Sequence, residues 1–302
     1  MLTRALVHLL LLLIAPPFFL GVINRVKSFF SGRTGPPLLQ LYYDIARLMG
    51  KGFAVSRTTT WIFWAAPVIS LAAVFSAGLL VPFGEESPVS FTGDAILFAY
   101  LFGLSRFLTT SSALDTGSAF EGMGAAREVT FACFAEPVLF LILIALTHMT
   151  GSLSLGDMLG ASLSAVWAVK GPPLLLISVG LFVLVLAENC RIPFDDPNTH
   201  LELTMIHEVM VLDHSGPLLG FVLYGAAMKL FVLGAVLVRL VAPVETGNAL
   251  LDAAILLVGN VLLAGMIGVV ESTMARLKLL KVPSLLVAAG ILCAFGFLLL
   301  LR

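Results

Sequence analysis

Residues 129–149, VTFACFAEPVLFLILIALTHM, decide the class of fold. About 20 consecutive helical residues cross the hydrocarbon core of a bilayer, and this run supplies that length. It contains one acidic residue, Glu136, about a third of the way along. The stretch therefore predicts a transmembrane helix that carries a carboxyl group inside the membrane.

The rest of the chain has the same character. Its 302 residues are 59% hydrophobic and 12% charged, with a mean hydropathy of +1.06, whereas soluble domains have roughly 25% charged residues. No internal repeat or linker divides the sequence. We therefore expect a single integral membrane domain over residues 1–302, an all-α membrane protein with about eight transmembrane helices. The seven further apolar runs are residues 5–23, 61–81, 94–110, 172–187, 218–241, 250–270 and 283–301.

The first run, residues 5–23, has two interpretations. A signal peptide is the alternative, but the run is long, contains Pro16 and Pro17, and has no small-residue cleavage site before Arg25 and Lys27. We interpret it as a retained helix.

Lys and Arg residues are distributed unequally between the two sets of loops. One set holds eleven of them, including Arg25, Lys27, Arg33 and Arg127, and the opposite set holds four. Positive loops stay in the cytoplasm during insertion. Eight spans with this asymmetry predict that both termini lie on the outer side.

Several functions are disfavoured by composition and motifs. The net charge of −1 gives no basic footprint for nucleic acid. Cys133, Cys190 and Cys293 have neither disulfide nor metal-ligand spacing. The sequence contains no Gly-rich phosphate loop, nucleophile elbow or CxxC pair, so we do not expect catalysis by this chain alone.

The predicted inner connections, residues 24–60, 114–128, 188–217 and 271–282, hold most of the charged residues and predict a surface for soluble partners. In the first connection, a Gly-Pro-Pro turn precedes leucine and isoleucine residues at helical spacing, which predicts a short amphipathic helix on the cytoplasmic side. The third contains an amphipathic stretch, residues 199–213. His200 and His207 there provide at most two imidazole ligands, so we predict no metal site.

The intramembrane charges are candidates for chemistry. An ionised carboxylate such as Glu136 costs a few kcal/mol in a span and is often functional, for example in a proton relay. The alternative is a protonated Glu bonded to a neighbouring helix. Arg106 and Lys229 also lie in apolar runs and can neutralise such acids.

A second group of acids gathers at the predicted inner boundary. Carboxyl groups this close together suit a proton-transfer chain. The alternative is that some are solvated loop charges or structural partners of Arg127 and Arg191. The group comprises Asp115, Glu121, Glu128, Glu188, Asp195, Asp196, Glu202, Glu208 and Asp213.

Four segments in order resemble one known family over essentially the whole chain. They are NRVKSFFSGRTGPPLLQLYYDIARLMGKG (24–52), LDTGSAFEGMGAARE (114–128), AENCRIPFDDP (187–197) and LELTMIHEVMVLDHSGP (201–217). Together they resemble the membrane subunit shared by respiratory complex I, where it is the H subunit, and the membrane-bound nickel-iron hydrogenases.

The resemblance implies roles for individual residues. In that family, acids form part of a polar path from a redox-active peripheral arm to antiporter-like proton pumps. The resemblance carries over Glu136, Glu188, Asp195, Glu202 and Asp213 as acids of this path, with Arg127 and Arg191 beside them. From the charge pattern we add Glu128 to the expected proton or charge relay and Arg106 and Lys229 to its supporting charges. The residues expected in partner-docking loops are Arg33, Gly35, Pro36, Asp44, Asp115, Glu121, Asp196, His200, His207 and Glu208.

Two departures favour one branch of the family. The loop after the Arg-x-Gly-Pro motif is shorter than in the quinone-reducing form, and the segment after PFD differs. The chain looks more like the hydrogenase-4 and formate hydrogenlyase branch of group 4 hydrogenases. A quinone-binding subunit of complex I is the alternative, and an independent transporter is a third.

The hydrogenase branch implies a non-catalytic subunit of an oxidoreductase complex in the cytoplasmic membrane of a prokaryote. It would anchor the large and small hydrogenase subunits and contact antiporter-like membrane subunits. No cofactor is expected in this chain, because the nickel-iron centre and iron-sulfur clusters would belong to the partners.

Overall fold

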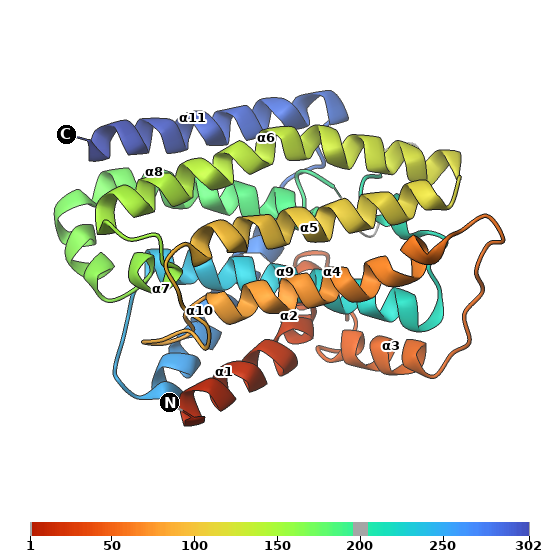
Figure 1. The fold of residues 1–302 in the computed structure, drawn as a ribbon, viewed down its shortest axis with the longest axis horizontal. Helices are drawn as coiled ribbons and strands as arrows, with labels where there is room; N and C mark the ends of the chain where they lie inside the picture. Colours follow the sequence, from red (N-terminus) through yellow and green to blue (C-terminus); the bar gives the residue numbers. More distant parts are fainter. Residues whose placement is uncertain (1, 196–204, 302) are drawn as a thin grey trace.

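The computed structural model describes residues 2–195 and 205–301, and all the regular secondary structure in these ranges is helical (Figure 1). Both termini lie at the same end of an elongated bundle. The helices are α1 (Leu2–Ile14), α2 (Pro16–Phe30), α3 (Gln40–Met49), α4 (Trp61–Leu80), α5 (Asp94–Asp115), α6 (Ala119–Thr150), α7 (Leu155–Met158), α8 (Ser162–Glu188), η1 (Glu208–Val211), α9 (Gly216–Val241), α10 (Ala249–Thr273), η2 (Leu279–Lys281) and α11 (Val282–Leu300).

Seven helices in the described ranges are long and apolar enough to cross a membrane, and a bent pair raises the number to eight. The seven are α4, α5, α6, α8, α9, α10 and α11, the last together with η2. The bent pair is α1 with α2. The prediction of an all-α membrane protein with about eight spans is confirmed.

The first apolar run is not the continuous helix that the sequence predicts. The chain bends by 47° between α1 and α2. Ala15 separates the two helices, and Pro16 begins the second. Proline has no N–H to continue the helical ladder, and its ring clashes with the preceding turn.

Two tyrosines bond the backbone carbonyls at this break. The Tyr224 hydroxyl donates to the carbonyl of Leu13 at 2.6 Å. The Tyr42 hydroxyl donates to the carbonyl of Ile14. Non-helical backbone at membrane depth needs such partners, because lipid offers none.

Two other predicted boundaries are wrong. Residues 114–128, predicted as a connection, are mostly helical, because α5 ends at Asp115 and α6 already begins at Ala119. The fifth span is longer than residues 172–187, since α8 starts at Ser162 and has non-helical backbone angles at Lys170, just before two prolines. Three predicted boundary acids, Asp115, Glu121 and Glu128, therefore lie on helices.

The amphipathic helix predicted after the Gly-Pro-Pro turn is confirmed as α3, with Arg47 in its last turn. The stretch at residues 199–213 differs from the amphipathic stretch that the sequence predicts. Residues 196–204 lie outside the described part of the chain, and Glu208–Val211 form the short 3-10 helix η1. Val209, Met210 and Val211 are all buried there, and three consecutive residues span more than one face of a regular helix.

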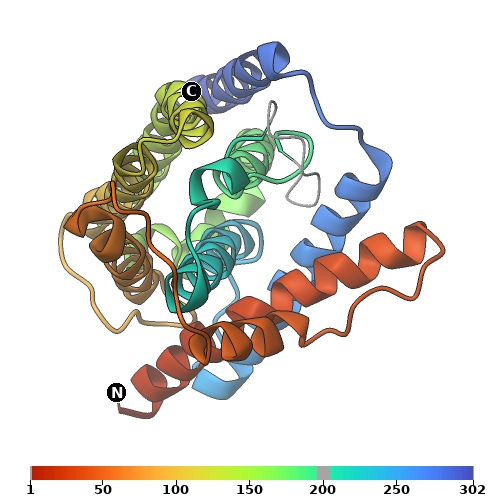
Figure 2. The ribbon, with the colours of Figure 1, turned by 90° about the vertical axis from the view of Figure 1, so that its right-hand side faces the viewer.

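Helices α8 and α9 occupy the middle of the bundle, and the other long helices surround them (Figure 2). Glycines bring several helices close together. A Cβ at Gly180 of α8 would lie 2.2 Å from the Cys293 sulfur of α11, and one at Gly268 of α10 would lie 2.7 Å from Val26 of α2. Small residues at such crossings are typical of membrane helices.

Candidate functional site

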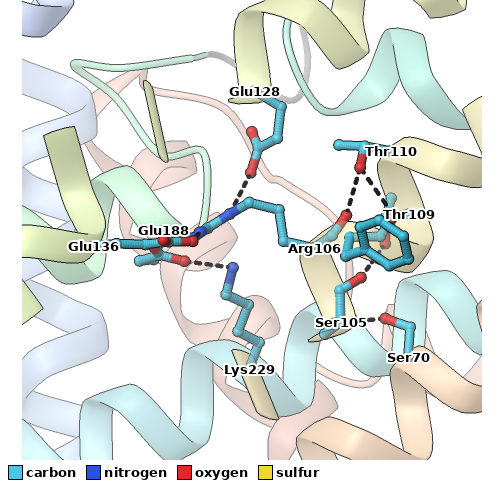
Figure 3. A network of polar contacts seen from close by, with 10 residues as sticks. Ser70, Ser105, Arg106, Thr109, Thr110, Glu128, Glu136, Glu188 and Lys229 are labelled. Atoms are coloured by element: carbon cyan, nitrogen blue, oxygen red, sulfur yellow. Dashed lines mark hydrogen bonds and ion pairs between the residues drawn. The ribbon is translucent and has the colours of Figure 1, made fainter. Parts of the chain in front are cut away.

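Three carboxylates converge on the guanidinium of Arg106, in the second half of α5 (Figure 3). Its Nε lies 3.3 Å from Glu128 Oε1 of α6, and its two terminal nitrogens contact Glu136 of α6 and Glu188 of α8. Lys229 of α9 adds a second cation, with its Nζ 2.7 Å from Glu188 Oε2. We call these residues the five-charge cluster.

The members of the cluster differ in accessibility. The side chains of Arg106 and Glu188 are 8% and 6% exposed, whereas that of Glu136 is 47% exposed. Glu136 therefore reaches from the buried cluster to the outer surface of α6. Because a carboxylate facing lipid is costly, this surface position favours a partner subunit over Glu136.

The charges of the cluster do not balance. Two cations face three carboxylates, so the cluster carries one excess negative charge when all five groups are ionised. Uptake of one proton would make it neutral. A buried site that differs by one proton between its charged and neutral forms is suited to proton relay.

A second group of ion pairs lies at the C-terminal ends of α2 and α10. The buried carboxylate of Glu271 is 2.8 Å from Lys27 Nζ and 3.4 Å from an Arg191 nitrogen. Asp195 lies 2.7 Å from an Arg276 nitrogen. Sequence reasoning missed Glu271, Lys27 and Arg276 as site residues, because charges at the ends of spans are common.

Four of the predicted relay acids lie in these two groups. Glu128, Glu136 and Glu188 share the five-charge cluster with Arg106 and Lys229, which the sequence named as neutralising charges. Asp195 and Arg191 belong to the second group.

The remaining relay and supporting residues lie elsewhere. Asp213 is exposed, and its backbone N–H donates to Glu121 at 2.9 Å. Arg127 donates to the carbonyl of Met205 at 2.8 Å. Glu202 lies outside the described residues.

The predicted docking residues include exposed residues and residues that are bound within the chain. Arg33, Gly35 and Pro36 are exposed in the loop after α2. Asp44 is half-buried and pairs with Arg47 of α3 at 3.4 Å.

Other docking candidates are bound within the chain or lie beyond its described part. Asp115 accepts hydrogen bonds from the backbone and hydroxyl of Thr60 at 2.7 and 2.8 Å. Glu121 is fully buried, so the expectation that it lies on a docking surface is wrong. His207 and Glu208 are half-buried. Asp196 and His200 lie outside the described ranges.

A cavity of about 100 Å³ lies beside the cluster, between α4, α5 and α9. Arg106, Glu128, Glu188 and Lys229 line it, but Glu136 does not. His214, in the loop between η1 and α9, lines it as well. A cavity of this volume with charged and hydroxyl groups in its lining has room for several water molecules.

His214 is buried, at 5% exposure. Its ring stacks on Phe63 with centroids 4.2 Å apart, and its Nε2 lies 3.2 Å from the hydroxyl of Ser112. Burial lowers the pKa of His214 from 6.5 to about 4. The imidazole is therefore neutral at pH 7.

This lowered pKa makes stability depend on pH. In the unfolded chain His214 binds a proton below about pH 6.5, whereas in the folded chain it does so only near pH 4. Between these values the unfolded state binds more protons, so stability falls as the pH falls. At pH 5 the loss should be about 2 kcal/mol relative to pH 7.5.

Thermal unfolding of the detergent-solubilised protein at both pH values measures this loss. The His214→Gln variant should lose less stability over the same interval. An equal loss in the variant would assign the pH dependence to other groups.

Comparison with known proteins places the whole chain in a family. The sequence model described as NADH dehydrogenase matches residues 3–302. Hydrogenase-4 component C of Escherichia coli (strain K12) is 29% identical, covering 92% of this chain and 89% of the relative. Formate hydrogenlyase subunit 4 of the same organism is also 29% identical, covering 97% and 94%.

Similarity to proteins of the quinone branch is less extensive. The H subunit of NADH-quinone oxidoreductase from Rhodospirillum centenum is 27% identical over 64% of this chain and 59% of the relative.

A chain of the membrane-bound sulfane sulfur reductase, an archaeal respiratory membrane complex, has the same fold, with a TM-score of 0.85 at 22% identity over 99% of both chains. Because the family model spans nearly all of the sequence, this multi-pass membrane protein belongs to the NADH dehydrogenase family.

Proposed function

We propose that this chain is the membrane anchor and proton- or charge-coupling subunit of a group 4 nickel-iron hydrogenase. The five-charge cluster carries the proposal. It holds one excess carboxylate, and it joins a cavity that four of its members line to the half-exposed Glu136 on α6. A relay between a soluble redox arm and a neighbouring membrane subunit requires a buried ionisable group that is connected to the surface of the chain.

Two observations support the hydrogenase type. The relatives named hydrogenase-4 component C and formate hydrogenlyase subunit 4 match over more than nine-tenths of this chain. The cavity of about 100 Å³ is smaller than the roughly 300–1,000 Å³ of sites for organic ligands. Water and protons fit this volume better than a quinone ring.

The partners follow from the proposed role. Hydrogenase large and small subunits, which would hold the nickel-iron centre and iron-sulfur clusters, would dock at the end of the bundle with the basic loops. Antiporter-like membrane subunits would cover the surface around Glu136. Basic loops also favour a cytoplasmic location for the docking end, which puts both termini on the outer side of a prokaryotic cytoplasmic membrane.

A quinone-binding subunit of a complex I type enzyme is the second candidate. Its support is the similarity to the H subunit of NADH-quinone oxidoreductase. In this case the cavity beside Arg106 would have to widen when partner subunits bind.

Purification of the tagged chain in mild detergent from its native membrane distinguishes these functions. We expect co-purification of iron-sulfur subunits with nickel and iron bound, and less than one quinone per complex. Mass spectrometry identifies the subunits, elemental analysis measures the metals, and solvent extraction measures quinone.

Each other outcome has a clear meaning. Stoichiometric quinone without nickel would replace the proposal with the quinone-binding function. A chain that purifies alone and transports an ion in liposomes would make it an independent transporter.

A further inference from the structure

The cavity beside the five-charge cluster contains a buried ring nitrogen that the proposed coupling path does not use. His214 Nδ1 has no hydrogen-bond partner among the described residues. The other ring nitrogen, Nε2, bonds Ser112 at 3.2 Å. If Nε2–H donates to that hydroxyl, Nδ1 is an acceptor, and a buried acceptor without a partner costs about 1–3 kcal/mol. A water molecule in the cavity would satisfy it.

A row of hydroxyl groups on α5 leads from His214 to the cluster. Ser105, Thr109 and Ser112 all line the cavity. Their spacing of four and three residues places them on one face of the helix. Ser112 follows Arg106 by six residues, which corresponds to about 9 Å along a helix axis. Hydroxyl groups at this spacing can hold water between His214 and Arg106.

The charged groups around His214 come from several elements. Helix α4, on whose Phe63 the ring stacks, has no charged residue. Besides His214, the ionisable groups that line the cavity are Arg106 of α5, Glu128 of α6, Glu188 of α8, Lys229 of α9, and Cys190, Arg191 and His207 of the intervening loops. Asp213 is the neighbour of His214 in the chain, and its backbone N–H donates to Glu121 of α6.

We propose that the cavity is filled with water and that His214 exchanges protons between this water and the Lys229–Glu188 end of the five-charge cluster. In each transfer Nδ1 takes the excess proton of a hydronium ion in the cavity water, which forms an imidazolium and leaves a neutral water molecule. The same nitrogen then releases this proton to a water molecule nearer Lys229, which becomes the hydronium ion. Nε2 stays bonded to Ser112 throughout, so no tautomer change is needed and the charge is restored.

The ionisation of His214 is compatible with this role. Because the ring is neutral at pH 7, Nδ1 is free to accept a proton. Water bonded to Nδ1 would also lessen the desolvation that opposes the imidazolium. The proposal extends the proposed coupling function and rests on it for the transport measurement, but the presence of water can be tested separately.

Hydroxyl-radical footprinting with X-ray pulses tests for the water, because radicals formed from internal water oxidise the side chains beside it. Two methionines provide a matched pair. Met210 lines the cavity and Met228 does not, yet both are 1% exposed. In the purified complex we expect Met210 to be oxidised at least about five times faster than Met228. Equal rates would show a dry cavity and overturn the proposal.

Replacement of the histidine tests its proton exchange. His214→Gln keeps a polar side chain beside Ser112 but cannot be protonated near neutral pH. In liposomes containing the whole complex, H2-linked proton movement should fall by about tenfold or more, as for loss of a positioned proton carrier. Hydrogen turnover with a soluble electron donor should be retained.

A second histidine is the control. His148 is exposed in the last turn of α6, far along that helix from Glu136. His148→Gln should leave the ratio of protons to H2 unchanged. If His214→Gln also leaves it unchanged while Glu136→Gln lowers it, His214 has no role but the coupling function stands. If neither lowers it, the coupling function itself fails.

If the His214→Gln complex does not assemble, Ser112→Ala gives a second test. This variant removes the group that orients Nε2 and retains the histidine. We expect slower proton movement with an unchanged subunit composition. Unchanged proton movement would contradict the role of His214 that depends on this bond.

Discussion

Replacement of Arg106 by leucine should strongly destabilise the fold of the chain. Arg106 contacts Glu128, Glu136 and Glu188, and only Lys229 would remain as a cation in the cluster. Removing one partner of a buried ion pair destabilises by about 3–5 kcal/mol, because the other charge stays buried. Native proteins are stable by only about 5–15 kcal/mol. The monodisperse fraction of detergent-extracted chain should therefore fall by about tenfold or more.

Charge and shape can be separated by two further variants. Arg106→Lys keeps the charge, but an ammonium group cannot contact three carboxylates as the guanidinium does. The monodisperse fraction of this variant should therefore lie between those of the wild type and Arg106→Leu. Arg106→Gln combined with Glu188→Gln leaves one cation, Lys229, and two carboxylates, Glu128 and Glu136, and so restores the net charge of the cluster. This double variant should be more stable than Arg106→Gln alone. A wild-type yield from Arg106→Leu would show that the cluster contributes nothing to stability.

The sequence singled out three members of the five-charge cluster, because an ionised group in an apolar run is conspicuous. Glu136, Arg106 and Lys229 were all found in this way. Their partners were not predictable, since Arg106 and Glu188 are 82 positions apart in the sequence. Only the packing of α5, α6, α8 and α9 brings these residues together.

The second group of ion pairs was missed for a related reason. Glu271 lies at the end of an apolar run, where a charge usually faces water. In the fold its carboxylate is buried because α2 and α10 pack closely at Gly268, which brings Lys27 alongside. Burial at a helix end depends on the neighbouring helix, which a single run of sequence does not contain.

The prediction of helix boundaries was wrong where the composition of a segment is typical of a loop but its backbone is helical. Residues 114–128 contain glycines and charged residues, which are typical of a loop, yet most of them extend α5 and α6. Gly124 there lies against Val209 of η1, and a Cβ would be 2.3 Å from that side chain. The glycine therefore serves packing of a helix rather than a turn.

Replacement of Glu136 by glutamine should separate hydrogen turnover from proton movement. The amide has nearly the shape of the carboxyl group and can still accept a hydrogen bond from Arg106, so assembly should be retained. It cannot release a proton. In liposomes containing the whole complex, protons moved per H2 should fall by about tenfold or more, given the usual contribution of a positioned proton carrier.

A glutamate outside the cluster shows whether the effect is specific. Glu86 is exposed and lies 3.6 Å from Arg4, at the end of the bundle that holds the termini. Such a surface pair contributes at most about 1 kcal/mol, so Glu86→Gln should leave the ratio unchanged. Subunit composition and nickel content are measured in the same samples. An unchanged ratio in fully assembled Glu136→Gln complex would exclude Glu136 from the relay, because no other member of the five-charge cluster reaches the surface to the same extent.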